Sequence, residues 1–186
     1  DSIQANINNI QAPVVDFVSD TACPGFPTHF QSTSIPFGND IISVYEWSFP
    51  NGSNGSGMVN SDYIHSNLNS YFVELTVETD SSCVNSNQKE VFIFEPPKPN
   101  FISDIQCFGQ NSSFTDFSVF NGNDSIISWF WLFNGNDTSL VQSPTAIMDS
   151  VGFNSVKLII QDLNLCIDSI TKTIEIFPAL LPDFEA

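Results

Sequence analysis

Apolar and polar side chains alternate along several short stretches of the chain. In one of them Tyr45, Trp47 and Phe49 take every second position, with Glu46 and Ser48 between them. An alternation with a period of two places one set of side chains on each face of a β-strand. The same alternation of aromatic or aliphatic residues occurs in 73–77, 91–93, 129–133, 156–160 and 174–176. The pattern predicts strands that each bury one face.

Clusters rich in asparagine and glycine separate these stretches. They lie at 51–57, 121–124 and 134–137. Both residue types tolerate positive φ angles, so the clusters predict turns. Helical periodicity of the apolar residues is nearly absent. Several short strands with frequent turns predict an all-β fold of the sandwich type.

The chain also matches itself. Segment 17–25, FVSDTACPG, recurs as segment 101–109, FISDIQCFG, 84 positions later. The offset is still 84 between Trp47 and Trp131, and it is 83 between Cys83 and Cys166. We therefore predict two similar modules, at 13–96 and 97–180, in an elongated array. The proline-rich segments 95–99 and 178–182 predict short, semi-rigid joints between modules.

Both ends of the chain belong to the same pattern. Asp1-Ser2-Ile3 lines up with Asp168-Ser169-Ile170 at an offset of 167. Residues 1–12 are accordingly predicted to hold the last strand of a preceding repeat and a linker. Pro182-Asp183-Phe184 repeats the opening of each module, so residues 181–186 are predicted to begin a following repeat.

The spacing of the aromatic and aliphatic motifs is similar to that of a known family. The motifs of the two modules are Pro13-x-x-x-Phe17, Trp47-Ser48-Phe49, Val73-x-Leu75-x-Val77, Trp131-Leu132-Phe133 and Val156-x-Leu158-x-Ile160. They resemble the PKD domain, an immunoglobulin-like β-sandwich, in the form common in repetitive surface proteins of Bacteroidota. Neither module keeps the Gly-Asp-Gly turn of that family. The resemblance implies a spacer, adhesive or filament-forming role at the cell surface, as in gliding-motility adhesins exported by the type IX secretion system.

The net charge of the chain argues against two classes of binding partner. The chain has 4 Lys and Arg residues against 21 Asp and Glu residues, a formal net charge of −17. That surface repels nucleic acid and anionic lipid, so we expect neither as a partner. No apolar stretch reaches the 18 residues that a membrane helix needs. The only histidines, His29 and His65, align with Ser113 and Met148 in the second module, which gives little support for catalysis.

The four cysteines fall one pair to a module, at matching places. This distribution favours disulfides within each module, Cys23 with Cys83 and Cys107 with Cys166, over the other two pairings. Disulfides imply an oxidising compartment, and we expect an extracellular or cell-surface location. A structural zinc site is the alternative, but no Cys-x-x-Cys spacing accompanies the pairs.

A tripeptide of Asp, then Ser or Thr, then a small apolar or β-branched residue occurs five times. It looks like the O-glycosylation sequence of Bacteroidota and would make the chain a glycoprotein. The candidate acceptors are Ser2, Thr21, Ser125, Ser150 and Ser169. The alternative is that Asp-Ser before a β-branched residue marks a turn that enters a strand.

Calcium is the one cofactor that the sequence suggests, because hard cations bind in loops where several oxygen ligands come together. Candidate ligands are Asn123 and Asp124 in one cluster and Asn136 and Asp137 in another. Neither cluster matches the twelve-residue EF-hand loop. Turn formation by asparagine and glycine explains both clusters without a metal.

Together these features predict a non-enzymatic structural or adhesive segment of a large secreted or surface-anchored bacterial protein, a disulfide-stapled rod or filament component. Its expected partners are neighbouring repeats, with self-association or surface glycans as further partners. Phe72 and Phe130 fall on the outward faces of predicted strands and are candidates for packing on a neighbouring chain. The alternatives are an accessory PKD module of an exported hydrolase and a glycan-binding module.

Overall fold

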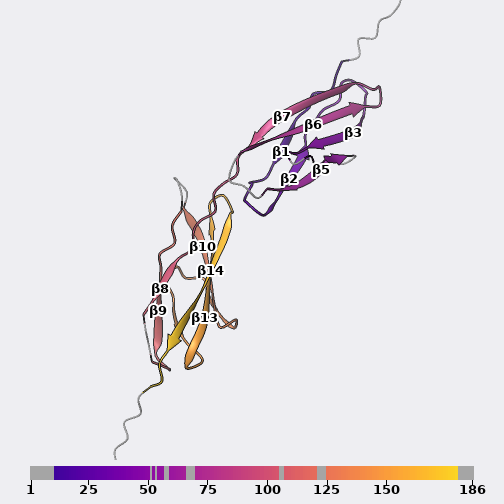
Figure 1. Cartoon of the computed structure of the whole chain (residues 1–186). Helices are drawn as coiled ribbons and strands as arrows, with labels where there is room; N and C mark the ends of the chain where they lie inside the picture. Colours follow the sequence, from indigo (N-terminus) through magenta and orange to yellow (C-terminus); the bar gives the residue numbers. More distant parts are fainter. Residues whose placement is uncertain are drawn as a thin grey trace, which may run out of the picture. The chain divides into compact units, whose positions relative to one another are not determined.

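The chain folds into two compact units, Asp1–Phe94 (unit 1) and Glu95–Ala186 (unit 2). The structure is a computed structural model that describes residues 11–50, 52, 54–56, 59–65, 70–104, 107–120 and 125–179. Every regular element among these residues is a β-strand (Figure 1). The part of the chain that is described contains no helix able to cross a bilayer.

Unit 1 is a sandwich of two antiparallel sheets. The first sheet has the order β1 (Phe17–Ser19), β2 (Pro27–Ser32), β5 (Asn60–Ile64). The second has the order β4 (Asn54–Ser56), β3 (Ile42–Ser48), β6 (Tyr71–Thr79), β7 (Val84–Val91). Strand β6 contains the alternating stretch 73–77, and β3 contains all but the last residue of 45–49. Strand β7 ends at Val91, the first residue of the stretch 91–93.

Unit 2 repeats this topology strand for strand. Its first sheet has the order β8 (Phe101–Ser103), β9 (Asn111–Asp116), β12 (Thr145–Ile147). Its second has the order β11 (Asp137–Ser139), β10 (Ile126–Phe133), β13 (Gly152–Asp162), β14 (Ile167–Ile176). The predicted all-β fold of immunoglobulin-like sandwiches is confirmed.

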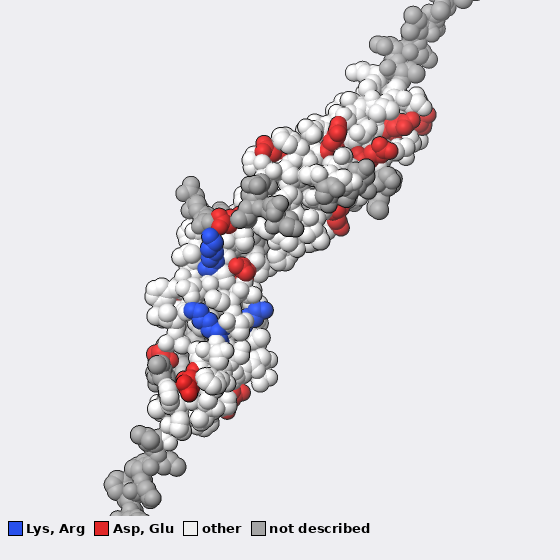
Figure 2. Space-filling view, in the orientation of Figure 1, with Lys and Arg blue, Asp and Glu red and all other residues white. Residues whose placement is uncertain are grey.

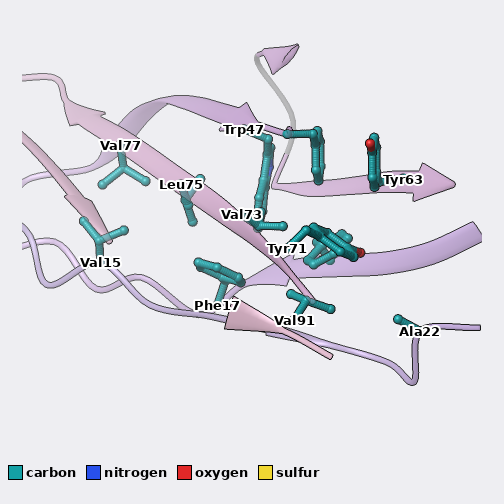
Figure 3. Close-up of a cluster of buried hydrophobic side chains, with 12 residues drawn as sticks. Val15, Phe17, Ala22, Trp47, Tyr63, Tyr71, Val73, Leu75, Val77 and Val91 are labelled. Atoms are coloured by element: carbon teal, nitrogen blue, oxygen red, sulfur yellow. The ribbon is translucent and has the colours of Figure 1, made fainter. Parts of the chain in front are cut away.

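A tryptophan lies at the centre of each core. Trp47 and Trp131 are both 0% exposed. The ring of Phe17 meets Trp47 edge-on at 5.3 Å between centroids, and Phe101 meets Trp131 at 5.0 Å. In Figure 3 Phe17 and Trp47 point into the same interior space from the two sheets. These pairs come from strands of different sheets, so they fix how the two sheets pack.

The aliphatic strand that pairs with each tryptophan strand buries one face, as predicted. Along β6 the residues Val73, Leu75 and Val77 are fully buried, and each alternates with a more exposed neighbour. In the ladder between β3 and β6 Trp47 pairs with Leu75, and in unit 2 Trp131 pairs with Leu158. The core residues of one module thus have their counterparts in the other module 84 or 83 positions away in the sequence.

The Asn-Gly cluster at 134–137 forms a tight turn. Asn134 and Gly135 both have positive φ, 49° and 78°, which is the requirement of a type I′ turn. The turn is closed by a hydrogen bond from the amide of Asn136 to the carbonyl of Phe133 (3.0 Å). The prediction of a turn at 134–137 is confirmed, and 121–124 lies outside the described residues. In 51–57 the prediction is wrong for residues 54–56, which form strand β4, while residues 51, 53 and 57 lie outside the described residues.

In each unit the segment before the first strand is already paired with the sandwich through its main chain. Val14 forms a two-way main-chain bridge with Ile35, and Lys98 forms the same bridge with Val119 in unit 2. Lys98 therefore belongs to the second sandwich and not to a free linker. The predicted orphan strand in residues 1–12 falls almost wholly outside the described residues, as does the predicted repeat start at 181–186.

Candidate functional site

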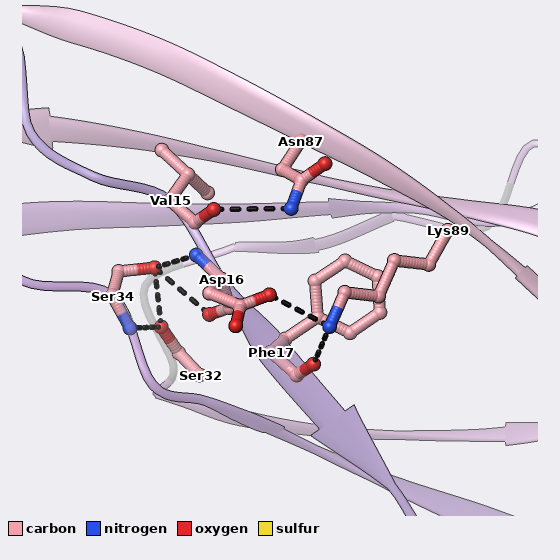
Figure 4. A network of polar contacts seen from close by, with 7 residues as sticks. All are labelled: Val15, Asp16, Phe17, Ser32, Ser34, Asn87 and Lys89. Atoms are coloured by element: carbon pink, nitrogen blue, oxygen red, sulfur yellow. Dashed lines mark hydrogen bonds and ion pairs between the residues drawn. The ribbon is translucent and has the colours of Figure 1, made fainter.

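A row of side chains closes one edge of the unit 1 sandwich. Strand β7 lies in one sheet, and the segment that leads into β1 lies beside the other sheet (Figure 4). Three side chains of β7 donate hydrogen bonds to main-chain carbonyls of that segment: Asn85 Nδ2 to Pro13 (2.8 Å), Asn87 Nδ2 to Val15 (3.1 Å) and Lys89 Nζ to Phe17 (2.6 Å). Both sides advance by two residues at each step. We call this row the seam, because it joins the two sheets where neither main chain pairs with the other.

Lys89 makes three interactions at the end of the seam. Besides its bond to the Phe17 carbonyl, its ammonium lies 2.6 Å from a carboxylate oxygen of Asp16. It also sits 5.1 Å from the centre of the Phe17 ring, in cation–π distance. The hydrogen bond from Lys89 holds the pKa of the exposed Asp16 carboxyl below its usual value.

Unit 2 keeps the lysine of the seam. Lys172 Nζ donates to the Phe101 carbonyl (2.5 Å) and lies 4.9 Å from the centre of the Phe101 ring. Its third contact is to Asn100 Oδ1 (2.7 Å), where unit 1 has the carboxylate of Asp16. Two of the four lysines of a strongly acidic chain therefore perform the same structural task. Sequence reasoning missed them, although Lys89 and Lys172 share the offset of 83.

The predicted disulfides within modules are wrong for this structure. Cys23 follows Ala22, which bridges Ile93 just beyond the end of β7, whereas Cys83 lies in the hairpin at the start of β7. A strand of this length separates the two ends by roughly 30 Å, and a disulfide needs Cα atoms about 6 Å apart. Cys107 bridges Phe177 beyond the end of β14, while Cys166 precedes β14, so the same separation applies in unit 2.

Cysteines at equivalent positions of the two units differ in whether they form a disulfide. Cys83 and Cys107 are free thiols, the first half-buried and the second exposed. Cys23 and Cys166 are both buried and both disulfide-bonded. Cys23 and Cys107 occupy equivalent turns, but only Cys23 is in a disulfide. Cys83 and Cys166 occupy equivalent hairpins, but only Cys166 is in a disulfide.

The two histidines are engaged in contacts that explain them structurally. His29 and Asp62 are cross-strand partners in the β2–β5 ladder, and His29 Nδ1 contacts the Asp62 carboxylate. The hydrogen bond to Asp62, helped by its charge, raises the pKa of His29 above the ordinary value. The ring of His65 stacks on Tyr71 at 4.6 Å. Burial raises the pKa of Tyr71.

The calcium candidates divide into two groups. Asn123 and Asp124 lie outside the described residues. Asn136 lies in the turn between β10 and β11, and Asp137 begins β11, where it pairs with Phe133. No group of three or more His, Cys, Asp or Glu side chains gathers to hold a metal within the described ranges.

The candidate glycosylation residues differ in accessibility. Ser125, Ser150 and Ser169 are exposed, Thr21 is half-buried, and Ser2 lies outside the described residues. The hydroxyl of Ser150 donates to Asn154 Oδ1 (3.0 Å), which gives it a structural role in the turn before β13.

One hollow of about 510 Å³ opens on unit 1. Phe72, Glu74 and Gln88 line it from the outward face of β6 and β7, and Pro50 and His65 line it from adjoining loops. Phe72 is 55% exposed, and in unit 2 Phe130 is 38% exposed, which confirms that both rings point outward. An aromatic face beside carboxylate and amide groups is a combination suited to a polar ligand with an apolar face.

Comparisons with known proteins return sandwiches of the same kind. No family model matches the chain, and no curated protein matches it. Among solved structures, the PKD1 domain of Vibrio anguillarum Epp is 19% identical, with 45% of this chain and 96% of that chain covered and a TM-score of 0.42. The PKD1 domain of the Vibrio cholerae metalloprotease PrtV is 23% identical, with coverages of 44% and 98% and a TM-score of 0.41. The fibronectin(III)-like modules of Clostridium thermocellum CbhA are 9% identical, with coverages of 94% and 98% and a TM-score of 0.46.

Proposed function

We propose that this chain is a non-enzymatic, structural segment of a large secreted or surface-anchored protein, in which PKD-like modules follow one another as a rod. The observation that carries the proposal is which residues the two modules share. They share the tryptophan core and the seam lysine, which hold each sandwich together. They do not share the groups that would do chemistry, because His29 and His65 align with Ser113 and Met148.

The outer surfaces of the two units differ accordingly. Glu46 and Glu74 on the outward face of unit 1 align with Phe130 and Lys157 in unit 2. Acidic side chains are spread over the face seen in Figure 2, among few lysines. Repetition of the interior with variation of the exterior is typical of modules whose common task is to span distance.

The oxidised cysteines support an exported location. Cys23 and Cys166 are disulfide-bonded, and stable disulfides persist mainly outside the cytosol. The resemblance to Bacteroidota surface repeats extends this proposal to an adhesin or filament of the gliding-motility type, exported by the type IX system. Its partners would then be neighbouring repeats and a surface that a distal region binds.

Small-angle X-ray scattering of the 186-residue chain tests the rod. Two sandwiches with strands of up to eleven residues, placed end to end, give a largest dimension of about 80 Å. A pair distribution with two maxima and a tail to that length supports the rod. A single symmetric maximum that ends near 50 Å contradicts it.

The hollow on unit 1 supports a second function, binding of a neutral glycan. Its outward ring, Phe72, stands beside Glu74 and Gln88, and sugars stack on exposed aromatic rings. A titration with neutral oligosaccharides followed by NMR tests this, with Phe72→Ala as the site variant. Phe92→Ala is the matched control, because Phe92 is exposed but does not line the hollow. Shifts that persist in Phe72→Ala, or no shifts at millimolar sugar, contradict it.

A further inference from the structure

We propose that one edge of unit 2 binds an extended peptide, which adds as a fourth strand beside β12 and places a lysine or arginine side chain against Asp137. This open edge consists of β12 from the first sheet and β11 from the second. The inference stands on unit 2 taken by itself and does not depend on the rod. Its grounds are a strand position that the fold leaves vacant, a hollow at that position, main-chain groups that the fold does not use and one carboxylate.

The two sheets of unit 2 differ by one strand. The first sheet has three strands and the second has four. Lys172 on β14 bonds to the Phe101 carbonyl on β8, which aligns one edge of each sheet. Because the sheets of a sandwich pack face to face, β8, β9 and β12 then lie opposite β14, β13 and β10. Strand β11 is left without a strand opposite it, and the vacant position lies beside β12.

A hollow of about 600 Å³ opens at this vacant position. All three residues of β11 and all three of β12 line it, together with Phe133 and Asn136. In the β10–β11 ladder Asp137 pairs with Phe133 and Ser139 pairs with Trp131, and both partners are buried in the core. Directly paired side chains share a face of the sheet. Asp137 and Ser139 therefore stand on the inner side of β11, where a facing strand would cover them.

The main chain of β12 has groups that the fold does not use. In an antiparallel pair, residues bonded to the partner strand alternate with residues whose N–H and C=O point the other way. Ser113 of β9 lies opposite Thr145, but its amide donates to Asp104 Oδ1 (2.6 Å) and its carbonyl accepts from the Asp104 amide (3.2 Å). Thr145 and, two residues on, Ile147 thus direct their N–H and C=O toward the open edge. Within the described ranges β12 pairs with β9 alone, so these groups are available to an added strand.

The side chains around the hollow define the kind of peptide. Among the described residues that line it Asp137 is the one with a charge, so a cationic side chain on the inner side of the peptide complements it. Thr145 and Ile147 lie on the outer face of β12, and Ile147 is 54% exposed. β-Branched residues on the outer side of the peptide would pack beside them. The matching pattern is a lysine or arginine between two β-branched residues.

Unit 1 offers an internal comparison, because its corresponding edge is narrower. Gly55 of β4 lies so close to Ser61 of β5 that a Cβ added to Gly55 would come 2.7 Å from Ser61 Oγ. Gly55 pairs with Trp47 in its ladder as Ser139 pairs with Trp131, so Ser139 stands in the place of that glycine in unit 2. The two edge strands are thus in contact in unit 1 and border a hollow in unit 2.

Titration of the 186-residue chain with the acetylated and amidated peptide Thr-Val-Lys-Val-Thr, followed by NMR, tests the proposal. It predicts saturable amide shifts at Thr145, at Ile147 and along β11. Shifts confined to other strands, or shifts spread over the acidic surface without saturation, would overturn it. Replacement of the peptide lysine by norleucine should weaken binding about threefold, and Asp137→Asn should weaken binding of the lysine peptide by the same factor. Unchanged affinity in both cases would also overturn it.

A proline at the edge distinguishes strand addition from other modes of binding. Ile147→Pro removes an N–H that the fold leaves unused, and edge strands tolerate proline for that reason. The affinity for the lysine peptide should fall about tenfold, because the peptide carbonyl that faces this position loses its donor. Ile64→Pro, at the equivalent position of β5 in unit 1, is the matched control and should leave the affinity unchanged. Equal affinities of the two variants, each shown by circular dichroism to keep its sheets, would contradict strand addition.

Discussion

Lys89 on the last strand of unit 1 holds the main-chain carbonyl of Phe17 on the first strand, at 2.6 Å, and covers the ring of the same residue. The contact joins the two sheets at an edge where no main-chain ladder runs between them. Lys172 and Phe101 repeat it in unit 2 at 2.5 Å. A polar residue that bridges two sheets is thus as much a part of the repeated module as its tryptophan.

Replacement of the seam lysine by methionine should destabilise the unit that carries it. The variant keeps most of the aliphatic stem but loses a charge-assisted hydrogen bond, worth about 1 kcal/mol after allowance for solvent at this half-exposed site. Urea unfolding of Lys89→Met and Lys172→Met measures the loss. Lys157→Met on the outward face of β13 is the control and should leave stability nearly unchanged. Equal effects of all three changes would show that the seam has no special role.

The sequence predicted the interior of this fold better than its edges. Alternation located the Trp47 and Trp131 strands, because burial of one face imposes a period of two. It did not predict β4, β5, β11 and β12, which are short and rich in Asn, Ser and Thr, so their pairing depends on neighbours and not on their own pattern. Matching positions of Cys23 and Cys83 within a repeat were misleading, since sequence position does not tell which end of a strand a residue occupies.

Truncation of the core leucine should destabilise one unit at a time. Leu75→Ala and Leu158→Ala each remove a fully buried side chain beside a tryptophan. The expected cost is about 3 kcal/mol for the affected unit, from lost burial and the cavity left behind. Hydrogen exchange of the separate units measures it. A loss of protection spread equally over both units in either variant would contradict two independent cores.

The buried amide of Asn154 should be indispensable to unit 2. It accepts from Asn134 Nδ2 (2.6 Å) and donates to the Ser150 and Gly152 carbonyls (3.0 and 2.9 Å). Asn154→Ala leaves these groups unpaired in the interior, which costs about 2–3 kcal/mol. Ser155→Ala is the neighbouring control, because Ser155 bonds to Asn134 through main-chain atoms: its amide donates to Asn134 Oδ1, and its carbonyl accepts from the Asn134 amide. Thermal unfolding that shifts equally in both variants would contradict this role.

The pair of His29 and Asp62 should make the stability of unit 1 depend weakly on pH. Because Asp62 raises the pKa of His29 in the folded state, the contribution is fully present below the ordinary value of about 6.5. It is lost as the pH rises through the higher folded-state pKa. An NMR titration of the His29 ring should show that pKa fall in Asp62→Asn. An unchanged titration in that variant would rule out the pairing.

Stretching single molecules by their two ends, with reductant present, tests the central claim most directly, since it reports the unfolding of each module separately. The account predicts two unfolding events, each releasing roughly 28 nm for a module of about 80 residues. A single event that extends the whole chain at once would contradict the claim that the chain is built from two similar, independently folded modules.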